Sequence, residues 1–507
     1  MRCCLARRKP LTGLTGINAR EMENASMRLR SFDRGSALRE FLHRAPHSRR
    51  RFLAGLAGLS ALPLLPARGS AQAMPALVEA RLVAAPREVQ LVPEKYPATG
   101  VWAYNGSVPG PVLRARQGER LRVHVENALA EQTTVHWHGI RLPNAMDGVP
   151  FITQRPIEPG GGFTYEFTLP DAGTFFYHPH QRSYEQVGRG LSGALIVEER
   201  TPPEVDRDVL WVLGDYRLSA DASIRGGFGH FMDLSHAGRI GNTVTLNGHM
   251  PESFRVRAGE RLRLRLINAA PARVFALEFR GHRPWVIALD GQPVEPHEPP
   301  GGAVVLGPAM RADLILDMTA APGSRHAVHD GFYARRPYDL VDLEYSDEAP
   351  LRARAGDPPR LPDNPLAEPE VRAAERHEIV FTGGMMGDMR GLPRGAAWAV
   401  NGVANGCGEG GSPFEPLLVL RKGRSYVLNL VNDTLWHHPI HLHGHSFRVV
   451  SRNGRPTRYR EWLDTVMLAP RERAEIAFVA DNPGDWMFHC HVLEHQASGM
   501  MSCIRVG

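Results

Sequence analysis

"NGSVPGPVLRARQGERLRVHVEN", residues 105–127, decides the fold because the chain repeats it. Echoes follow at 247–268, as "NGHMPESFRVRAGERLRLRLIN", and at 401–432, as "NGVANGCGEGGSPFEPLLVLRKGRSYVLNLVN", which carries an insertion. In each copy a glycine turn precedes a segment in which apolar and polar residues alternate, as in a strand with one buried face. Leu121, Val123 and Val125 form that face in the first copy. Three copies predict three related domains.

We expect these domains to be β-sandwiches. The 507 residues include 51 Gly and 41 Pro, with hardly any long amphipathic helical pattern, which favours the all-β class. "LSGALIVEER" ends the first domain near residue 200, and the Pro-rich stretch around 355–371 is typical of a linker. The expected domains are 74–200, 201–365 and 366–507.

Residues 1–73 have the features of an export signal. "SRRRFLAGLAGLSALPLLPARGSAQA" at 48–73 combines twin arginines, an apolar run and small residues at its end. This resembles the twin-arginine signal, with cleavage after Ala73 and a periplasmic destination. An ordinary secretory signal is the alternative, and Met27 is a candidate for a later start. No later segment has about 20 uninterrupted apolar residues, so we expect no membrane span.

Charge and cysteine content exclude several classes. The net charge of +6 comes mostly from scattered arginines, so no nucleic-acid partner is predicted. Five cysteines, two of them in the leader, exclude a disulfide framework. Cys407 and Cys503 form either a single bridge or two inert thiols.

Histidines are the strongest functional signal. "HWH", "HPH", "HLH" and "HCH" each place two imidazoles two residues apart, and side chains at that spacing share one face of a strand. "AGTFFYHPH" and "PGDWMFHCH" match one another in spacing across the first and third domains, and the middle domain has no counterpart. From the middle domain we expect a spacing role and no ligands. Eight imidazoles exceed what one zinc ion binds, so the pairs predict a cluster of several metals between the outer domains: His136, His138, His178, His180, His441, His443, His489 and His491.

A second site is predicted from residues that remain. Cys490 lies on the opposite strand face from His489 and His491, so it serves a different centre. His438, Cys490, His495 and Met500 are the donor set of a mononuclear electron-transfer copper. "HCH" then joins the two centres through one tripeptide.

At this point the chain resembles a known family. "HWHG", "HPH", "HHPIHLHGHSF" and "HCHVLEHQASGM" resemble the four copper-binding motifs of the laccase-like multicopper oxidases, and the likeness covers essentially the whole mature chain. It implies three tandem cupredoxin domains and four copper ions. It also implies that four one-electron donors are oxidised at type 1 while a trinuclear cluster reduces O2 to two waters.

The resemblance implies a role for each ligand. Type 1 copper would bind His438, Cys490, His495 and Met500; type 2 would bind His136 and His441; and the type 3 pair would bind His138, His178, His180, His443, His489 and His491.

Residues next to these motifs bear on proton delivery. Asp147, in "LPNAMDGVP", resembles an acid beside the cluster in relatives and is expected to relay protons; a plain turn Asp before Gly148 is the alternative. Gln496 stands where some relatives have an acid, and Glu494 is expected to support ligands rather than act in catalysis. His438, not the adjacent His437, fits the motif.

The electron donor stays open between phenols, aromatic amines, Mn(II) and Cu(I). Copper-efflux oxidases carry Met-rich insertions, and this chain offers only Met385, Met386 and Met389 in "GGMMGDM". The alternatives to an oxidase are a copper tolerance protein, acting by cuprous oxidation or sequestration, and a structural protein of cupredoxin repeats. Three repeats disfavour a two-domain nitrite reductase, and the Cys and Met disfavour a zinc hydrolase.

Overall fold

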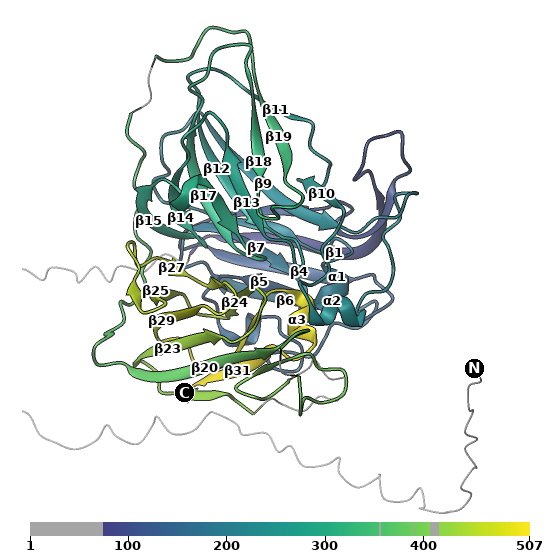
Figure 1. Ribbon diagram of the computed structural model, residues 1–507, viewed down its shortest axis with the longest axis vertical. Helices are drawn as coiled ribbons and strands as arrows, with labels where there is room; N and C mark the ends of the chain where they lie inside the picture. Colours follow the sequence, from purple (N-terminus) through teal and green to yellow (C-terminus); the bar gives the residue numbers. More distant parts are fainter. Residues whose placement is uncertain (1–74, 354–355, 388, 406–414) are drawn as a thin grey trace, which may run out of the picture. The chain divides into compact units, whose positions relative to one another are not determined.

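The computed structural model describes residues 75–353, 356–387, 389–405 and 415–507 (Figure 1). The predicted export signal and Cys407 therefore lie outside the described residues, and with them the possible Cys407–Cys503 bridge. Within the described chain, no helix has the length and apolar character needed to cross a bilayer.

Strands dominate the described chain and form six sheets, two in each third of the sequence (Figure 1). The first third has a sheet of order β2-β1-β4-β6 and a sheet of order β3-β8-β7-β5. Their strands are β1 Leu77–Val89, β2 Thr99–Tyr104, β3 Gly110–Arg116, β4 Arg120–Asn127, β5 His136–His138, β6 Gly162–Thr168, β7 Gly173–His178 and β8 Gly193–Glu198.

The middle third repeats this plan with longer sheets, of order β10-β9-β12-β17-β14-β15 and β11-β19-β18-β13-β16. The strands are β9 Arg207–Tyr216, β10 Thr243–Leu246, β11 Ser253–Val256, β12 Arg261–Asn268, β13 Phe275–Phe279, β14 Trp285–Leu289, β15 Gln292–His297, β16 Val304–Leu306, β17 Arg311–Asp317, β18 Arg325–Asp330 and β19 Tyr338–Tyr345.

The last third has sheets of order β21-β20-β23-β29-β25-β26, with β27 on β25, and β22-β31-β30-β24-β28. The strands are β20 Glu375–Gly383, β21 Trp398–Val400, β22 Leu418–Leu420, β23 Ser425–Asn432, β24 His438–Leu442, β25 Phe447–Arg452, β26 Arg455–Pro456, β27 Trp462–Leu463, β28 Thr465–Leu468, β29 Arg473–Val479, β30 Gly484–Cys490 and β31 Met501–Val506. The all-β prediction is confirmed.

Helices are short: α1 Ser183–Gln186, α2 Phe231–Ser235, α3 Leu493–Ala497, and the 3-10 turns η1 Asn144–Met146 and η2 Pro300–Gly302.

The three sequence repeats have the same place in the fold, because each one crosses from one sheet of its third to the other. In each, a first strand (β3, β11 or β22) lies in one sheet and the next strand (β4, β12 or β23) in the other. The alternation in β4 is as predicted, because Leu121, Val123 and Val125 are buried while His124 and Glu126 are exposed.

The asparagine that ends each repeat explains part of its recurrence. Asn127, Asn268 and Asn432 are buried, and each side chain accepts one backbone N–H and donates to two backbone carbonyls in its own third. A buried amide with its hydrogen bonds satisfied holds a strand end to the following loops. The repeated sequence thus encodes a repeated structural joint.

The hydrophobic core links the two ends of the chain. One buried cluster runs through the first and last thirds and includes Val135, Trp137, Phe488 and Val492, whereas the middle third has a largely separate core around Leu264. The first and last thirds therefore pack directly against one another. This brings "HWHG" beside the motifs of the last third.

Candidate metal centres

The smaller centre lies where β24 and β30 pair and α3 follows. The Cys490 Sγ atom lies 3.5 Å from Nδ1 of His438 and 3.6 Å from Nδ1 of His495, and those nitrogens are 3.1 Å apart. Such a triangle suits one metal ion with bonds of about 2.0–2.3 Å. Met500 is fully buried, and its backbone N–H donates to the carbonyl of His495 while its carbonyl accepts from the Cys490 N–H. The four predicted residues are therefore brought together.

Burial sets the protonation of this centre. It raises the pKa of the Cys490 thiol and lowers the pKa of His495 to about 3. Burial also lowers the pKa of His438 well below its usual value, helped by the neighbouring His495. The imidazoles are therefore neutral and ready to bind a metal, while the thiol must lose its proton on binding.

The larger centre is formed by all four histidine pairs. The eight imidazoles are buried, and they come from β5, from β7 and its end, from β24 and its end, and from β30 and its end. Only His136 and His138 share one strand completely. In the other three pairs the second histidine follows the last strand residue, so strand alternation alone did not predict their placement.

The resemblance implies two triples and a pair, and all of them lie within one contiguous group of eight imidazoles. The shortest centroid distances in that group, 3.9 Å for His136–His443 and 3.8 Å for His138–His441, join different sets. His138, His178 and His491 have centroids 5.0–5.8 Å apart. His180, His443 and His489 have centroids 4.9–5.2 Å apart. His136 and His441 lie 5.9 Å apart, and His136 also contacts members of both triples.

The ring nitrogens fit a metal-binding role. Nε2 of His136, His180 and His441 and Nδ1 of His138 are buried with no hydrogen-bond partner among the described residues. Nε2 of His443 and His489 approach to 3.1 Å, and those of His178 and His491 to 3.3 Å. One unsatisfied buried polar atom costs about 1–3 kcal/mol, so several in one place indicate a ligand, and neutral imidazoles suit copper.

Six of the eight imidazoles are held through their Nδ1 atom, that of His443 by the Asp147 carboxylate. The Nδ1 atoms of His136, His178, His441 and His489 lie 2.8–3.2 Å from backbone carbonyl oxygens, and that of His180 lies 3.4 Å from the Gln496 amide. Such contacts fix ring orientation. The His489 partner is the carbonyl of Cys490, which ties the two centres together through a hydrogen bond as well as through the chain.

Two aspartates each orient two histidines from opposite ends of the chain. The Asp147 carbonyl accepts from His136, and its carboxylate lies 2.8 Å from Nδ1 of His443. The Asp464 carbonyl accepts from His441, and its carboxylate lies 3.0 Å from Nε2 of His138. Sequence reasoning found Asp147 and missed Asp464, whose "LDT" context carries no distinctive signal.

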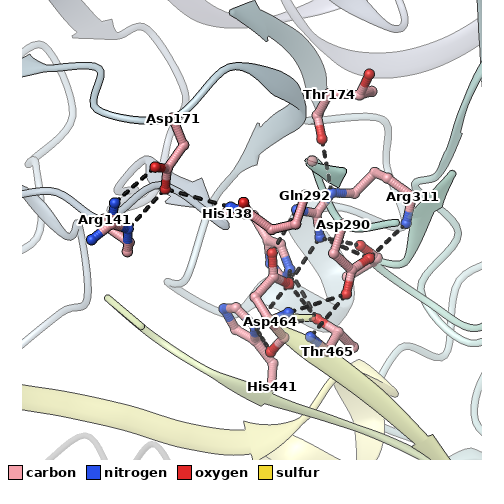
Figure 2. A network of polar contacts seen from close by, with 12 residues as sticks. His138, Arg141, Asp171, Thr174, Asp290, Gln292, Arg311, His441, Asp464 and Thr465 are labelled. Carbon is pink, nitrogen blue, oxygen red and sulfur yellow. Dashed lines mark hydrogen bonds and ion pairs between the residues drawn. The ribbon is translucent and has the colours of Figure 1, made fainter. Parts of the chain in front are cut away.

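The middle third supports both centres, which the sequence did not predict. Arg311 of β17 makes a bidentate ion pair with Asp464, and Asp290 accepts from the backbone N–H groups of Asp464 and Thr465 (Figure 2). Although burial opposes ionisation, Arg311 holds the pKa of Asp464 well below its usual value. At the smaller centre, the His236 carbonyl lies 2.6 Å from Nε2 of His495. No middle-third residue is among the predicted ligands.

The residues flagged beside the motifs also have defined places. Glu494 is buried with neither carboxylate oxygen hydrogen-bonded among the described residues, and burial raises its pKa to about 7. His437 packs against Phe332, so His438 alone of that pair lies beside Cys490.

Six other histidines of the described chain belong to none of the candidate metal-binding groups. His124, His249, His282, His329 and His445 each have a side-chain hydrogen bond, and His230 caps α2.

Comparisons with known proteins agree with this geometry. Three family models, each described as multicopper oxidase, match residues 86–202, 218–329 and 393–507. Multicopper oxidase MmcO of Mycobacterium tuberculosis is 31% identical, over 89% of this chain and 95% of its own. Laccase-1 of Fomitopsis schrenkii is 29% identical, over 80% and 82%. The crystal structure of a multicopper oxidase from Pseudomonas thermotolerans has a TM-score of 0.76 and 36% identity, covering 85% of this chain and all of that one.

Proposed function

Because the chain belongs to the multicopper oxidase family, with three cupredoxin domains and a copper-dependent reaction with O2, we propose how its own residues divide the work. The donor is a phenol, an aromatic amine or a metal ion, oxidised one electron at a time. The domains are assigned to 74–200, 201–365 and 366–507. Export by the twin-arginine route to the periplasm is part of the proposal and rests on the sequence of residues 48–73.

One observation carries the ligand assignment: Cys490, which forms a triangle with His438 and His495, lies in sequence between two members of a contiguous group of eight buried imidazoles. We assign type 1 copper to that triangle with Met500. The pair His136 and His441 is assigned to type 2, and the triples to the type 3 ions. Copper bound there supplies one-electron transfer at type 1 and four-electron reduction of O2 to water at the cluster.

The chain positions these centres and connects them. Cys490 lies between His489 and His491 in sequence, and His489 donates to the Cys490 carbonyl at 2.9 Å. An electron that reaches Cys490 therefore has a short covalent and hydrogen-bonded route to both triples. Burial of all eight cluster imidazoles excludes bulk water, which limits the release of partly reduced oxygen.

Asp147 is proposed as the proton relay. Its Oδ2 atom lies 2.8 Å from His443, and its Oδ1 atom lies 3.2 Å from His136 with no hydrogen-bond partner. The carboxylate therefore has an oxygen directed toward the histidines of the cluster that can accept or deliver a proton. On the other side, the Gln496 amide near His180 cannot serve as an acid.

A copper tolerance role through cuprous oxidation is the second candidate, and one placement favours it. Met385 is hydrogen-bonded to Ser235 at the end of α2, and Trp436 donates to the Met385 carbonyl. His236, next to Ser235, accepts from the type 1 ligand His495. The backbone of Met385 is thus hydrogen-bonded to the chain neighbour of the residue whose carbonyl holds His495, and its segment carries soft thioethers.

Oxygen uptake by the copper-loaded mature protein, with copper content measured alongside, tests the function. Phenol, Cu(I) and Mn(II) are offered in parallel. We expect about four coppers per chain and O2 consumption with one donor well ahead. Copper binding with no donor-driven uptake would leave sequestration or a structural role in its place.

A further inference from the structure

Arg311 is a buried charged residue of the middle domain. A single residue, Asp464, connects it to two of the proposed copper ligands. It is fully buried, and its guanidinium donates to both carboxylate oxygens of Asp464, at 2.9 and 2.5 Å. Its Nε atom donates to the Thr174 carbonyl in β7 of the first domain. Arg311 therefore contacts both outer domains at once (Figure 2).

Asp464 passes this contact on to two proposed ligands. Its Oδ1 atom lies 3.0 Å from Nε2 of His138, which leaves Nδ1 of that ring directed to the cluster. Its own carbonyl holds His441, and Thr465 Oγ lies between the two rings, at 3.1 Å from His138 and 3.2 Å from His441. The orientation of one type 3 ligand and one type 2 ligand depends on where Asp464 sits.

Asp290 fixes the backbone of the same segment. This residue follows β14 directly and is fully buried; its Oδ1 accepts from the Arg311 backbone N–H and its Oδ2 from the N–H groups of Asp464 and Thr465. Arg311 thus anchors the Asp464 side chain while Asp290 anchors its main chain.

The first domain closes tightly over the ion pair. Gly139, the last residue of "HWHG", has φ of 84°, and a Cβ there would lie 2.4 Å from Arg311 Nη2 and 2.5 Å from Asp464 Oδ2. Any side chain at 139 must displace the pair. The glycine in this motif is therefore explained by the approach of the middle domain.

We propose that Arg311 and Asp290 are positioning residues for the copper cluster, so that the middle domain orients His138 and His441 through Asp464. The middle domain then has a part in building the cluster beyond spacing the outer two. This inference rests on the proposed copper ligands.

Arg263 offers a matched control. It is also a fully buried arginine of the middle domain, and it pairs with Glu199 and Asp313 without touching any proposed ligand. Loss of either arginine takes the cation from a buried carboxylate, Asp464 for Arg311 and Glu199 for Arg263, and costs stability. Of the two arginines, only Arg311 contacts a residue that is hydrogen-bonded to proposed cluster ligands, so only its loss should disturb the orientation of those ligands.

The test compares Arg311→Met, Arg311→Lys and Arg263→Met, each loaded with copper. Copper per chain, the type 2 electron paramagnetic resonance signal and the type 1 visible absorption are measured. We expect Arg311→Met to weaken copper binding at the cluster by about 10–100-fold, as supporting residues of metal sites do, with type 1 absorption kept. Arg311→Lys should restore part of the binding because its ammonium can still contact Asp464. Arg263→Met should unfold more easily but keep the wild-type type 2 signal.

Gly139→Ala and Asp290→Asn test the same inference without changing Arg311. If Arg311→Met does not fold, Asp290→Asn provides the deciding measurement. Each should alter the type 2 signal while type 1 absorption persists. The inference is overturned if the Arg311 and Asp290 variants keep wild-type copper content and type 2 signal, or if they lose both centres in parallel. Wild-type protein without cluster copper would instead overturn the proposed function.

Discussion

At the scale of single residues, the cluster depends on aspartates that do two tasks each. Asp147 and Asp464 each hold one histidine of their own domain with a backbone carbonyl and one of the other domain with a carboxylate. The arrangement is nearly symmetric, but of these two aspartates Arg311 pairs with Asp464 and not with Asp147. Arg311 thereby holds Asp464 as an anion, and Asp147 is the proposed proton relay.

Asp147→Asn tests that division. An asparagine oxygen can still accept from His443 Nδ1, so copper content should stay normal, while the lost acid should slow O2 turnover by about 10²-fold. Copper analysis and steady-state oxygen uptake measure the two effects. Asp171→Asn is the control, since Asp171 is a buried carboxylate paired with Arg141 that touches none of the eight imidazoles. Full turnover by Asp147→Asn with normal copper would end the relay hypothesis.

The buried histidines also predict how the copper-free protein responds to acid. Burial lowers the pKa of seven of them well below the usual 6.5: His138, His178, His180, His438, His443, His489 and His491. Below pH 6.5 the unfolded chain therefore binds more protons than the folded chain. Their contribution to stability is present above about pH 6.5 and is lost as the pH falls.

Each such histidine contributes a slope of up to about 1.4 kcal/mol per pH unit. Burial raises the pKa of Glu494 and Asp290 to about 7, which acts in the opposite direction, but the histidines whose pKa is lowered are more numerous. Denaturant unfolding of the copper-free protein should show a falling free energy of unfolding from about pH 6.5 downward. A flat profile between about pH 7 and 5 would show that these histidines are protonated in the folded state.

At the scale of elements, strand pairing decides which motifs meet. β5 pairs with β7, so that His136 lies opposite His178, and β24 pairs with β30, so that His441 lies opposite His489. Ile440 lies opposite Cys490 in this pairing, and the residues next to Cys490 in the strand point to the opposite face of the sheet. Because successive side chains of a strand point to opposite faces, Cys490 belongs to the smaller centre, while its sequence neighbour His489 belongs to the larger one.

The segment with Met385, Met386 and Met389 is the proposed site of a soft-metal donor. Replacing all three with Leu keeps apolar volume but removes the thioether ligands. We expect cuprous oxidation to lose about tenfold in kcat/KM, equal to about 1.4 kcal/mol, with phenol oxidation unchanged. Steady-state rates with both donors provide the measurement. Met232→Leu, another exposed methionine on α2, is the control, and equal losses with both donors would reject the soft-metal role.

At the scale of the whole molecule, the proposed cluster joins the first and third domains, whereas the type 1 site lies within the third. Copper that binds only the folded state should stabilise the chain by about 2.7 kcal/mol at a hundredfold excess over Kd. Calorimetry should show the outer domains unfolding together at a higher temperature in the copper-loaded protein than in the copper-free one.

The variant Cys490→Ser tests whether the joint unfolding of the outer domains depends on the type 1 site or on the cluster. It removes the thiolate of the type 1 site but leaves all eight cluster imidazoles, so the joint transition should persist without type 1 absorption. Loss of the joint transition in this variant would mean that the type 1 site, not the cluster, couples the domains.

The sequence by itself determined the all-β class and the threefold repeat, and it predicted the proposed copper ligands. Those features are local: alternation, turn glycines, and the spacing from Cys490 through His495 to Met500 are all contained within short stretches. For the same reason Asp147, nine residues after His138, was visible as a candidate.

Only the tertiary structure decided how the motifs are held. Asp464, Arg311, Asp290 and the His236 carbonyl act on ligands far away in sequence, and no pattern within their own strands distinguishes them from ordinary buried polar residues. Their role arises because burial removes water, so every polar group must find a partner across domain boundaries. The chain encodes its ligands in motifs, and the packing of three domains orients them.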